Sequence, residues 1–269
     1  MKTSFMSALA LVVAFAATSV FSATVFLDPV NGDDENGGFL ETEPVKSFER
    51  ARTQANGGLV YLMSTLSVTE DTTFDLDGGT LRRYISSDGT VTNTADLISC
   101  NTAGVTLEFS NITVEGIGTD VRISGHLVAA AKANVKLGKN AVLCKSYTQT
   151  TGAGVTCANL TMTDNAKITL CRVATPASQA GGAGATVSGL LKMSGFSEIC
   201  FNTNYCEYKS SVSGQRIAGG VYCGSFEMED NASIHNNRSQ AQGYLYGISF
   251  GGAGLHVRGA TTSIMRGNA

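Results

Sequence analysis

The chain has 269 residues, of which 31 are glycine and only 15% are charged, a composition that argues against a bundle of helices. The formal net charge of −3 argues against a nucleic-acid partner, because binding to phosphates requires a basic surface. Tryptophan is absent, so a platform for stacking sugar rings is not obvious either.

Residues 1–23 are predicted to form a secretory signal peptide. Lys2 precedes an apolar run centred on residues 8–17, and small residues follow that run. The segment is too short and wrongly flanked for a membrane span, and cleavage is expected after Ser22 or Ala23. No later stretch approaches the roughly 20 apolar residues that a membrane helix needs. The sequence therefore predicts an exported protein, extracellular or at the cell surface, without a transmembrane span.

Residues 24–57 begin with an extended segment and an acidic loop. The segment at Val25 runs into a stretch of Asp, Asn and Gly that contains Asp28, Asp33 and Asp34. These residue types favour turns, so we expect a solvated turn. Oxygen ligands for a hard cation are the alternative interpretation of the same carboxylates. We predict no metal at this loop.

One amphipathic helix is predicted between Pro44 and Ala55. Val45, Phe48, Ala51 and Ala55 recur at helical spacing, and the sequence Asn-Gly-Gly at 56–58 is a typical helix stop. The open end of a stacked sheet exposes apolar core and unpaired strand edges. We therefore expect this helix to cap the first turn of the structure that follows.

Four nine-residue segments align on one another, at 135–143, 160–168, 191–199 and 226–234. Each segment has the order apolar, polar, apolar, three turn-type residues, a small residue, a polar residue and an aliphatic residue. Successive segments begin 25, 31 and 35 residues apart. A fixed pattern at variable intervals indicates stacked units whose insertions lie in loops. Apolar spacings of two and six suit short strands and a tight corner rather than a helix. Residues 58–269 are therefore predicted to form an all-β, right-handed single-stranded parallel β-helix of seven to eight coils.

The aligned segments predict three interior columns, in which like residues stack from coil to coil. Asn140, Asn165 and Asn231 recur at the corner, where asparagine tolerates left-handed backbone and stacked amides can bond along the axis, and Phe196 interrupts this column. The predicted columns are Val135/Leu160/Leu191/Phe226, Leu137/Met162/Met193/Met228 and Leu143/Ile168/Ile199/Ile234.

The seven cysteines are those of an exported chain, which suggests disulfides. Cys157 and Cys223 occupy inward positions two coils apart, so we expect both to pack in the core without bonding each other. Cys200 and Cys206 flank a loop where they could pair. No two cysteines show the gap typical of structural zinc sites, so we expect no cysteine-ligated zinc and no cofactor.

The last coil is predicted to be incomplete. Segments 255–257 and 262–264 begin another repeat, and the sequence stops in repeat-like residues at Ala269. The exposed end requires a cover. We expect either missing sequence of a longer repeat protein or a partner subunit to supply it.

Two parts of the chain resemble known β-helix proteins. The stretches Asp28-Pro-Val-Asn-Gly-Asp33-Asp34 and Pro44-Val-Lys-Ser-Phe48, with Ala51, resemble the N-terminal element of right-handed β-helix proteins of the pectin-lyase-like superfamily. The repeats resemble polymorphic outer-membrane, adhesin-like proteins, which carry Gly-Gly-Ala-aliphatic and Phe-x-x-Asn tetrads. The matching tetrads here are 181–184, 251–254, 201–204 and, more loosely, 219–221 and 234–237. The resemblance implies a β-helix and an adhesin-like role, but no segment here could form an autotransporter barrel.

Motifs that would carry chemistry are weak. The glycine runs lack the aspartates of a calcium-binding roll, so we interpret them as turns. Outward carboxylates such as Glu227 and Glu229 show no basic residue in register, while Arg172, Lys192 and Arg216 appear scattered. His126, His235 and His256 fall in different registers, which predicts no catalytic triad.

The sequence therefore predicts a secreted or surface adhesin-like module that binds a glycan or a protein without catalysis. The segment 203–218 is the expected contact loop, because long loops on rigid scaffolds carry function. Its candidate binding residues are Tyr205, Tyr208, Lys209 and Arg216. The alternative function is that of a polysaccharide lyase or glycoside hydrolase, which would require positioned carboxylates or a basic residue in a groove.

Overall fold

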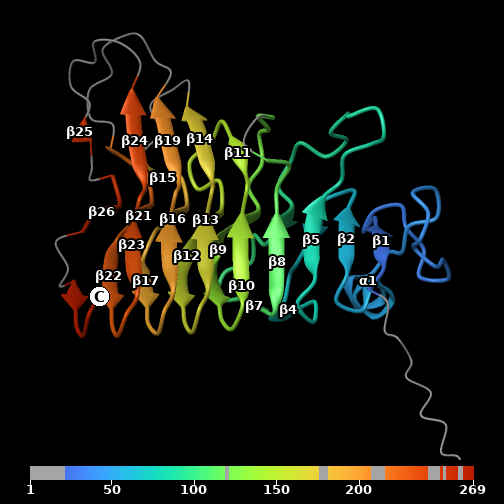
Figure 1. Ribbon diagram of the computed structural model, residues 1–269, viewed down its shortest axis with the longest axis horizontal. Helices are drawn as coiled ribbons and strands as arrows, with labels where there is room; N and C mark the ends of the chain where they lie inside the picture. Colours follow the sequence, from blue (N-terminus) through green and yellow to red (C-terminus); the bar gives the residue numbers. More distant parts are fainter. Residues whose placement is uncertain are drawn as a thin grey trace, which may run out of the picture.

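A computed structural model of the chain describes residues 22–118, 121–175, 181–206, 216–241, 249–250, 253–259 and 263–269. These residues form a parallel β-solenoid of about seven turns with one short helix, which confirms the predicted fold class. Figure 1 shows the turns stacked side by side along the long axis, with β1 and α1 at one end and β27 at the other. Every strand pair recorded between them is parallel.

The strands of successive turns assemble into four sheets. The first contains β1 (Thr24–Leu27), β2 (Leu59–Leu62), β5 (Thr80–Arg83), β8 (Ile112–Glu115), β10 (Ala141–Cys144), β13 (Lys167–Thr169), β18 (Glu198–Cys200) and β23 (Ser233–His235). The second contains β3 (Leu66–Ser67), β4 (Thr72–Asp75), β6 (Ile98–Ser99), β7 (Thr106–Ser110), β9 (Val128–Leu137), β12 (Val155–Met162), β16 (Ala185–Val187), β17 (Leu190–Met193), β21 (Val221–Cys223), β22 (Ser225–Met228), β26 (Leu255–Val257) and β27 (Ile264–Met265). The third contains β11 (Tyr147–Thr148), β14 (Arg172–Thr175), β19 (Thr203–Cys206) and β24 (Arg238–Ala241). The fourth contains β15 (Gly181–Gly182), β20 (Arg216–Ala218) and β25 (Ser249–Phe250).

The predicted interior columns are confirmed by the strand register. Met162 lies opposite Leu137 and Met193, and Met193 lies opposite Met228, so the Leu/Met column is continuous over four turns. The other two columns pair in the same way across β10, β13, β18 and β23 and across β9, β12, β17 and β22. Most of these side chains are fully buried, and each contributes roughly 1.5–3 kcal/mol to stability.

The helix α1 (Phe48–Ala55) caps the first turn as predicted, but it begins later than its apolar spacing suggested. The side chain of Ser47 accepts a hydrogen bond from the backbone N–H of Arg50 and starts the helix. Val45 belongs instead to a β-bridge with Leu27, because its backbone bonds to the first strand. Ala51 and Ala55 are buried, and Phe48 packs edge-on against Phe74 of the solenoid.

The acidic loop before the helix is held together by its own carboxylates. Asp28 accepts hydrogen bonds from the backbone of Val30 and Asn31 and from the Ser64 hydroxyl, which lies 2.5 Å from it. Burial raises the pKa of Asp28, but these hydrogen bonds outweigh burial and hold the pKa below its usual value. The Asp34 carboxylate accepts from the backbone N–H groups of residues 46 and 47. These contacts support the turn interpretation of the loop.

The corner asparagines form the expected ladder, although the left-handed residue differs between turns. Asn140 itself has φ +55°, whereas in the next turn Asp164 is left-handed and Asn165 follows it. Nδ2 of Asn165 lies 2.7 Å from Oδ1 of Asn140, and Asn140 contacts Asn111 in turn. Phe196 stands in this column and is 69% exposed. The amides therefore bond along the axis wherever the column contains asparagine.

The glycines at 181–184 do more than form a turn, because the first two belong to a strand and Gly184 makes a close packing contact in a bend. Gly181 and Gly182 form β15 and pair with Ile217 and Ala218. A Cβ atom on Gly184 would lie 2.8 Å from Nδ2 of Asn202 and 2.9 Å from the Gly220 carbonyl oxygen. Glycine is needed here because backbone and buried amides approach too closely for any side chain.

The cysteines whose side chains the structure describes are buried free thiols. Cys157 and Cys223 are buried and unbonded as predicted, and Cys200 is a free thiol, so the pairing considered for Cys200 is not present. Within the described ranges, no helix is both long and apolar enough to cross a membrane.

Candidate functional site

The outer face of β14, β19 and β24 presents the strongest candidate site. These strands pair in register, so Arg172, Thr203 and Arg238 are aligned across the sheet. Successive side chains on a strand point to opposite faces. Val173 and Asn204 come next along their strands and are fully buried. The two arginines and the threonine between them therefore project outwards.

A left-handed corner precedes each of these strands. Leu170 and Phe201 both have φ +56°, and Lys145 and Asn236 occupy the same place in neighbouring turns with φ +57° and +52°. The left-handed conformation costs a residue other than glycine about 1–2 kcal/mol. It turns the side chains of Leu170 and Phe201 outwards, where they are 42% and 50% exposed. The corner thus adds an apolar rim to the face that carries the arginines.

Buried amides stabilise these corners. Oδ1 of Asn202 accepts a hydrogen bond from the Cys171 backbone N–H over 2.9 Å, and Nδ2 donates to the Ile168 carbonyl over 3.1 Å. Asn237 repeats the arrangement one turn later, accepting from the Asn202 backbone N–H and donating to the Ile199 carbonyl. Hydrogen bonds of this kind are strong in a dry interior and hold strained backbone in one conformation.

A shallow groove of about 370 Å³ lies over this face. Arg172 is positioned by Tyr147, with its guanidinium carbon 4.6 Å from the ring centroid. The described residues that line the groove include two arginines and no carboxylate, so the groove is positively charged. The lining residues are Leu170, Cys171, Arg172, Phe201, Thr203, Tyr205, Arg238 and Gln240.

Only part of the site predicted from sequence falls in this groove. Tyr205 lines it, as a residue of β19 rather than of a loop. The expected loop 203–218 is wrong at both ends, because Thr203–Cys206 and Arg216–Ala218 are strands that pair with neighbouring turns. Tyr208 and Lys209 lie outside the described residues, and for Arg216 only the backbone is described, as the start of β20.

Arg172 and Arg238 were overlooked as a pair, although the sequence carries a signal for them. Arg172 lies four residues after Ile168 of the aligned core pattern, and Arg238 lies four residues after Ile234. If the repeat alignment is extended beyond its last aliphatic residue to include the next corner, Arg172 and Arg238 fall in the same column. They are not scattered, because the corner has the same length in each of these turns.

The chain was compared with protein-family models, with curated proteins and with solved structures. None of them matches it. The functional interpretation therefore depends on the geometry of the site itself.

The outward carboxylates of the neighbouring faces are paired, which corrects the expectation that they lack basic residues in register. Lys167 contacts Glu198 with 2.6 Å between Nζ and Oε2. Lys192 lies directly opposite Glu227 and contacts it at 3.4 Å. The pKa of Glu198 is lowered, because the hydrogen bond from Lys167 outweighs partial burial. Both carboxylates are therefore paired with a lysine of the neighbouring turn.

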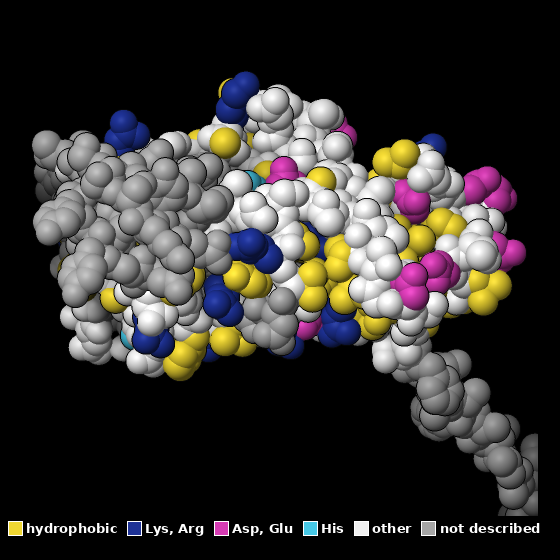
Figure 2. Space-filling view, turned by 90° about the horizontal axis from the view of Figure 1, so that it is seen from above, with side chains coloured by type: hydrophobic (Ala, Val, Ile, Leu, Met, Phe, Trp, Pro, Cys, Tyr) yellow, Lys and Arg dark blue, Asp and Glu magenta, His cyan; other side chains and the backbone are white. Residues whose placement is uncertain are grey.

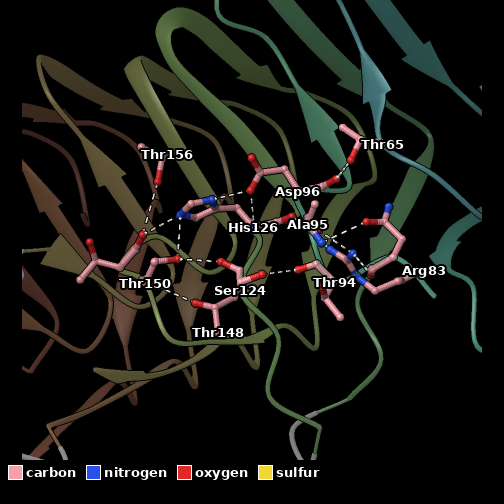
Figure 3. Close-up of polar contacts among 12 residues, drawn as sticks. Thr65, Arg83, Thr94, Ala95, Asp96, Ser124, His126, Thr148, Thr150 and Thr156 are labelled. Atoms are coloured by element: carbon pink, nitrogen blue, oxygen red, sulfur yellow. Dashed lines mark hydrogen bonds and ion pairs between the residues drawn. The ribbon is translucent and has the colours of Figure 1, made fainter. Parts of the chain in front are cut away.

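A second polar cluster surrounds His126, whose ring pairs with Asp96 (Figure 3). Nδ1 of His126 lies 2.8 Å from Oδ1 of Asp96, while Nε2 lies 3.3 Å from the Thr150 hydroxyl and 3.1 Å from the Thr151 carbonyl oxygen. The Thr150 hydroxyl also lies 3.2 Å from the Ser124 carbonyl oxygen. The ring therefore bridges the Asp96 carboxylate to oxygens of Thr150 and Thr151 in the next turn, which favours a structural role over a nucleophilic triad.

Arg83 extends this cluster into the interior. Its side chain is fully buried and donates to the carbonyl oxygens of Asn93 and Ala95, the latter over 2.7 Å. Burial lowers the pKa of Arg83 to about 10, so the guanidinium stays charged at neutral pH. Arg83 and His126 together fasten the segment between β5 and β6 to the solenoid (Figure 3).

Proposed function

We propose that the protein is an exported recognition module that binds acidic glycans, without cleaving them, in the groove over β14, β19 and β24. One observation carries the proposal. Arg172 and Arg238 point into the same groove from turns on either side of Thr203, and no carboxylate stands among the described residues that line it.

The side chains of the groove suit a sugar acid or a sulfated sugar. A guanidinium presents a rigid fork of N–H donors that matches carboxylate and sulfate groups and bonds to them in pairs. Thr203 and Gln240 supply hydrogen-bonding groups of the kind that sugar hydroxyls require. Phe201 and Tyr205 offer aromatic surface at the rim. Because these residues belong to paired strands or adjoin them, little backbone freedom is lost on binding.

Acidic side chains are numerous at the end of the molecule away from β14, β19 and β24 (Figures 1 and 2). Seen from above in Figure 2, acidic side chains gather at the end that carries the N-terminal elements, whereas Lys and Arg side chains lie over the middle of the molecule. An anionic chain would be repelled from the N-terminal end.

Export and an adhesin-like role are part of the proposal. The signal-peptide pattern of residues 1–23 supports an extracellular or cell-surface location. The resemblance of the repeats to polymorphic outer-membrane, adhesin-like proteins supports surface recognition, since Phe201 of the Phe-x-x-Asn tetrad lines the groove. A polysaccharide lyase or hydrolase of the pectin-lyase-like type is the alternative that turnover would reveal.

The test is a binding and turnover screen of the purified protein against neutral, uronate-rich and sulfated polysaccharides. Affinity, unsaturated products and new reducing ends are recorded in the same samples. We expect binding to acidic but not neutral glycans, weakening as salt is added, with no product. The double variant Arg172→Ala/Arg238→Ala should lose at least about tenfold in affinity, which corresponds to about 1.4 kcal/mol.

The matched control is Lys132→Ala/Lys136→Ala, which removes two positive charges from exposed positions of β9, on another sheet. It should retain binding if the groove is the site. Equal losses in both double variants would show only a general charge effect and contradict the proposal. Products that disappear in the arginine variant would instead favour the lyase or hydrolase.

A further inference from the structure

Three side chains with metal-binding atoms meet on the outer face of the first sheet. Glu198 and Cys200 are two residues apart on β18, so they point to the same side. His235 on β23 lies directly opposite Cys200. Ile199 and Ile234 fill the inward positions of these strands. Glu198 and His235 are half-buried on this face, whereas Cys200 beside them is fully buried.

The distances between these groups are short. Nε2 of His235 lies 3.8 Å from Oε1 of Glu198, and Sγ of Cys200 lies 3.9 Å from Oε2 of Glu198. One ligand atom from each of the three residues lies within 4.8 Å of the other two. With zinc–ligand bonds of 2.0–2.3 Å, ligand atoms around a tetrahedral zinc ion are roughly 3.3–3.7 Å apart. Closing the cluster onto an ion therefore requires only small side-chain movements.

We propose that Glu198, Cys200 and His235 bind a zinc ion. Thiolate, imidazole and carboxylate are the three protein ligands of zinc, and a set that mixes sulfur and nitrogen with oxygen disfavours calcium and magnesium. Three protein ligands leave a fourth position for water or for a donor atom of a bound molecule. Residue spacing along the chain does not reveal the site, because His235 comes from the next turn.

Neighbouring residues orient the ligands. Nδ2 of Asn236 lies 3.0 Å from Nδ1 of His235, and an amide in the opposite orientation would accept the Nδ1 proton and leave Nε2 free for the metal. Phe201 packs edge-on against the His235 ring, with 5.8 Å between centroids. The Thr169 hydroxyl lies 3.6 Å from the Cys200 sulfur. Such contacts around the ligands are typical of metal sites.

Lys167 would compete with a zinc ion for the Glu198 carboxylate. Its Nζ atom lies 2.6 Å from Oε2 of Glu198, so the carboxylate is neutralised in the absence of metal. Zinc must share or displace this contact. Removing the lysine charge should therefore strengthen zinc binding, whereas removing a ligand should weaken it. An ordinary ion pair beside a packed cysteine would not predict the first effect.

The experiment titrates zinc into the full-length protein, purified without a histidine tag, in competition with a chromophoric chelator. Cobalt(II) serves as the spectroscopic probe. We expect one zinc per chain, and for cobalt a thiolate-to-metal charge-transfer band together with intense tetrahedral d–d bands. Cys200→Ser and His235→Ala should each bind zinc at least about tenfold more weakly, and Lys167→Met should bind it more tightly.

The matched control is Cys144→Ser, which removes a thiol from the same outward column but opposite Glu115 and Thr169 instead of a histidine. It should leave zinc affinity unchanged. Cobalt binding by the unmodified protein without thiolate charge transfer would overturn the proposal, even if the variants fold poorly. So would unchanged affinity in Cys200→Ser. Because Arg172→Ala/Arg238→Ala leaves these ligands intact, zinc binding and glycan binding can be tested separately.

Discussion

Asn165 donates a hydrogen bond from Nδ2 to Oδ1 of Asn140 over 2.7 Å, across two adjacent turns of the solenoid. In return, Oδ1 of Asn165 accepts from the Asn140 backbone N–H over 2.8 Å. Both residues are exposed, so water competes for the same groups. The ladder therefore contributes less to stability than the apolar column that runs beside it in the interior.

This comparison yields a first prediction. Met193→Ala should lower the free energy of unfolding by about 2–5 kcal/mol, because Met193 is fully buried between Met162 and Met228 and truncation leaves a cavity. Asn165→Ala should cost only about 0.5–1.5 kcal/mol. Urea denaturation of both variants measures the difference. A greater loss of unfolding free energy in Asn165→Ala than in Met193→Ala would show that the amide ladder contributes more to stability than the apolar core.

Filling the gap in the ladder should stabilise the protein. Phe196 follows the left-handed Gly195, just as Asn165 follows Asp164, and its ring is 69% exposed. Phe196→Asn would place an amide in line with Asn165, and should add about 0.5–1.5 kcal/mol by continuing the ladder. The denaturant midpoints of the variant and of the unmodified protein measure this change in stability. Phe196→Ala is the control, since it removes the ring without adding an amide, and equal midpoints for the two variants would contradict the prediction.

The close packing of the glycine tetrads can be tested at Gly184. Gly184→Ala would place a Cβ atom 2.8 Å from Nδ2 of the buried Asn202, and displacing that amide should cost about 1–3 kcal/mol. Gly138→Ala is the matched control, because its nearest contact would be an ordinary 3.7 Å from the Phe109 carbonyl oxygen. It should stay within about 0.5 kcal/mol of the unmodified protein. Similar thermal midpoints for both variants would show that the chain accommodates a Cβ atom at Gly184 and would contradict the prediction.

The Asp96–His126 pair predicts a loss of stability in acid. Burial raises the pKa of Asp96, but the hydrogen bonds from His126 outweigh it, so the folded-state pKa lies below the ordinary value of 3.8. A carboxyl with a lowered pKa adds stability that is present above pH 3.8 and is lost as the pH falls through the folded-state pKa. Asp96→Asn should therefore cost about 1–2 kcal/mol at pH 6, and less as the pH falls below 3.8.

Denaturation of Asp96→Asn and of the unmodified protein at several pH values from 3 to 6 measures this dependence. Glu70→Gln, which removes one exposed carboxylate from another turn, reports the effect of net charge alone. A stability difference for Asp96→Asn that stays constant over this range would show that the aspartate carboxyl is not the titrating group.

Several features of the fold could be predicted because they repeat locally. Met162 and Met193 occupy the same place in a nine-residue pattern, and the pleat of a strand sends that position inwards in every turn. The start of the helix could not be placed in the same way. Val45 fits the apolar spacing of α1, but its backbone is bonded to the first strand, a contact that no spacing reports.

The candidate site shows the same division. Tyr205 was predicted for its residue type and lines the groove, whereas Arg172 was judged to be scattered and Arg238 was not considered. They are 66 residues apart in the sequence, yet only Thr203 separates them in the register of the sheet. The two arginines align because the corner before the strand has the same length in all three turns. This regularity is hard to see in the sequence, because loops of variable length separate the repeats.

By itself, the sequence determined the solenoid, its interior columns and the helix that caps it, because alternation and repeat spacing are properties of neighbouring residues. Only the tertiary structure decided which outward side chains meet. Arg172 joins Arg238, and His235 joins Cys200, because parallel pairing aligns residues of successive turns. The physical reason is that hydrogen bonds between turns set the register on the outer face, and that register depends on where each insertion leaves and rejoins the solenoid.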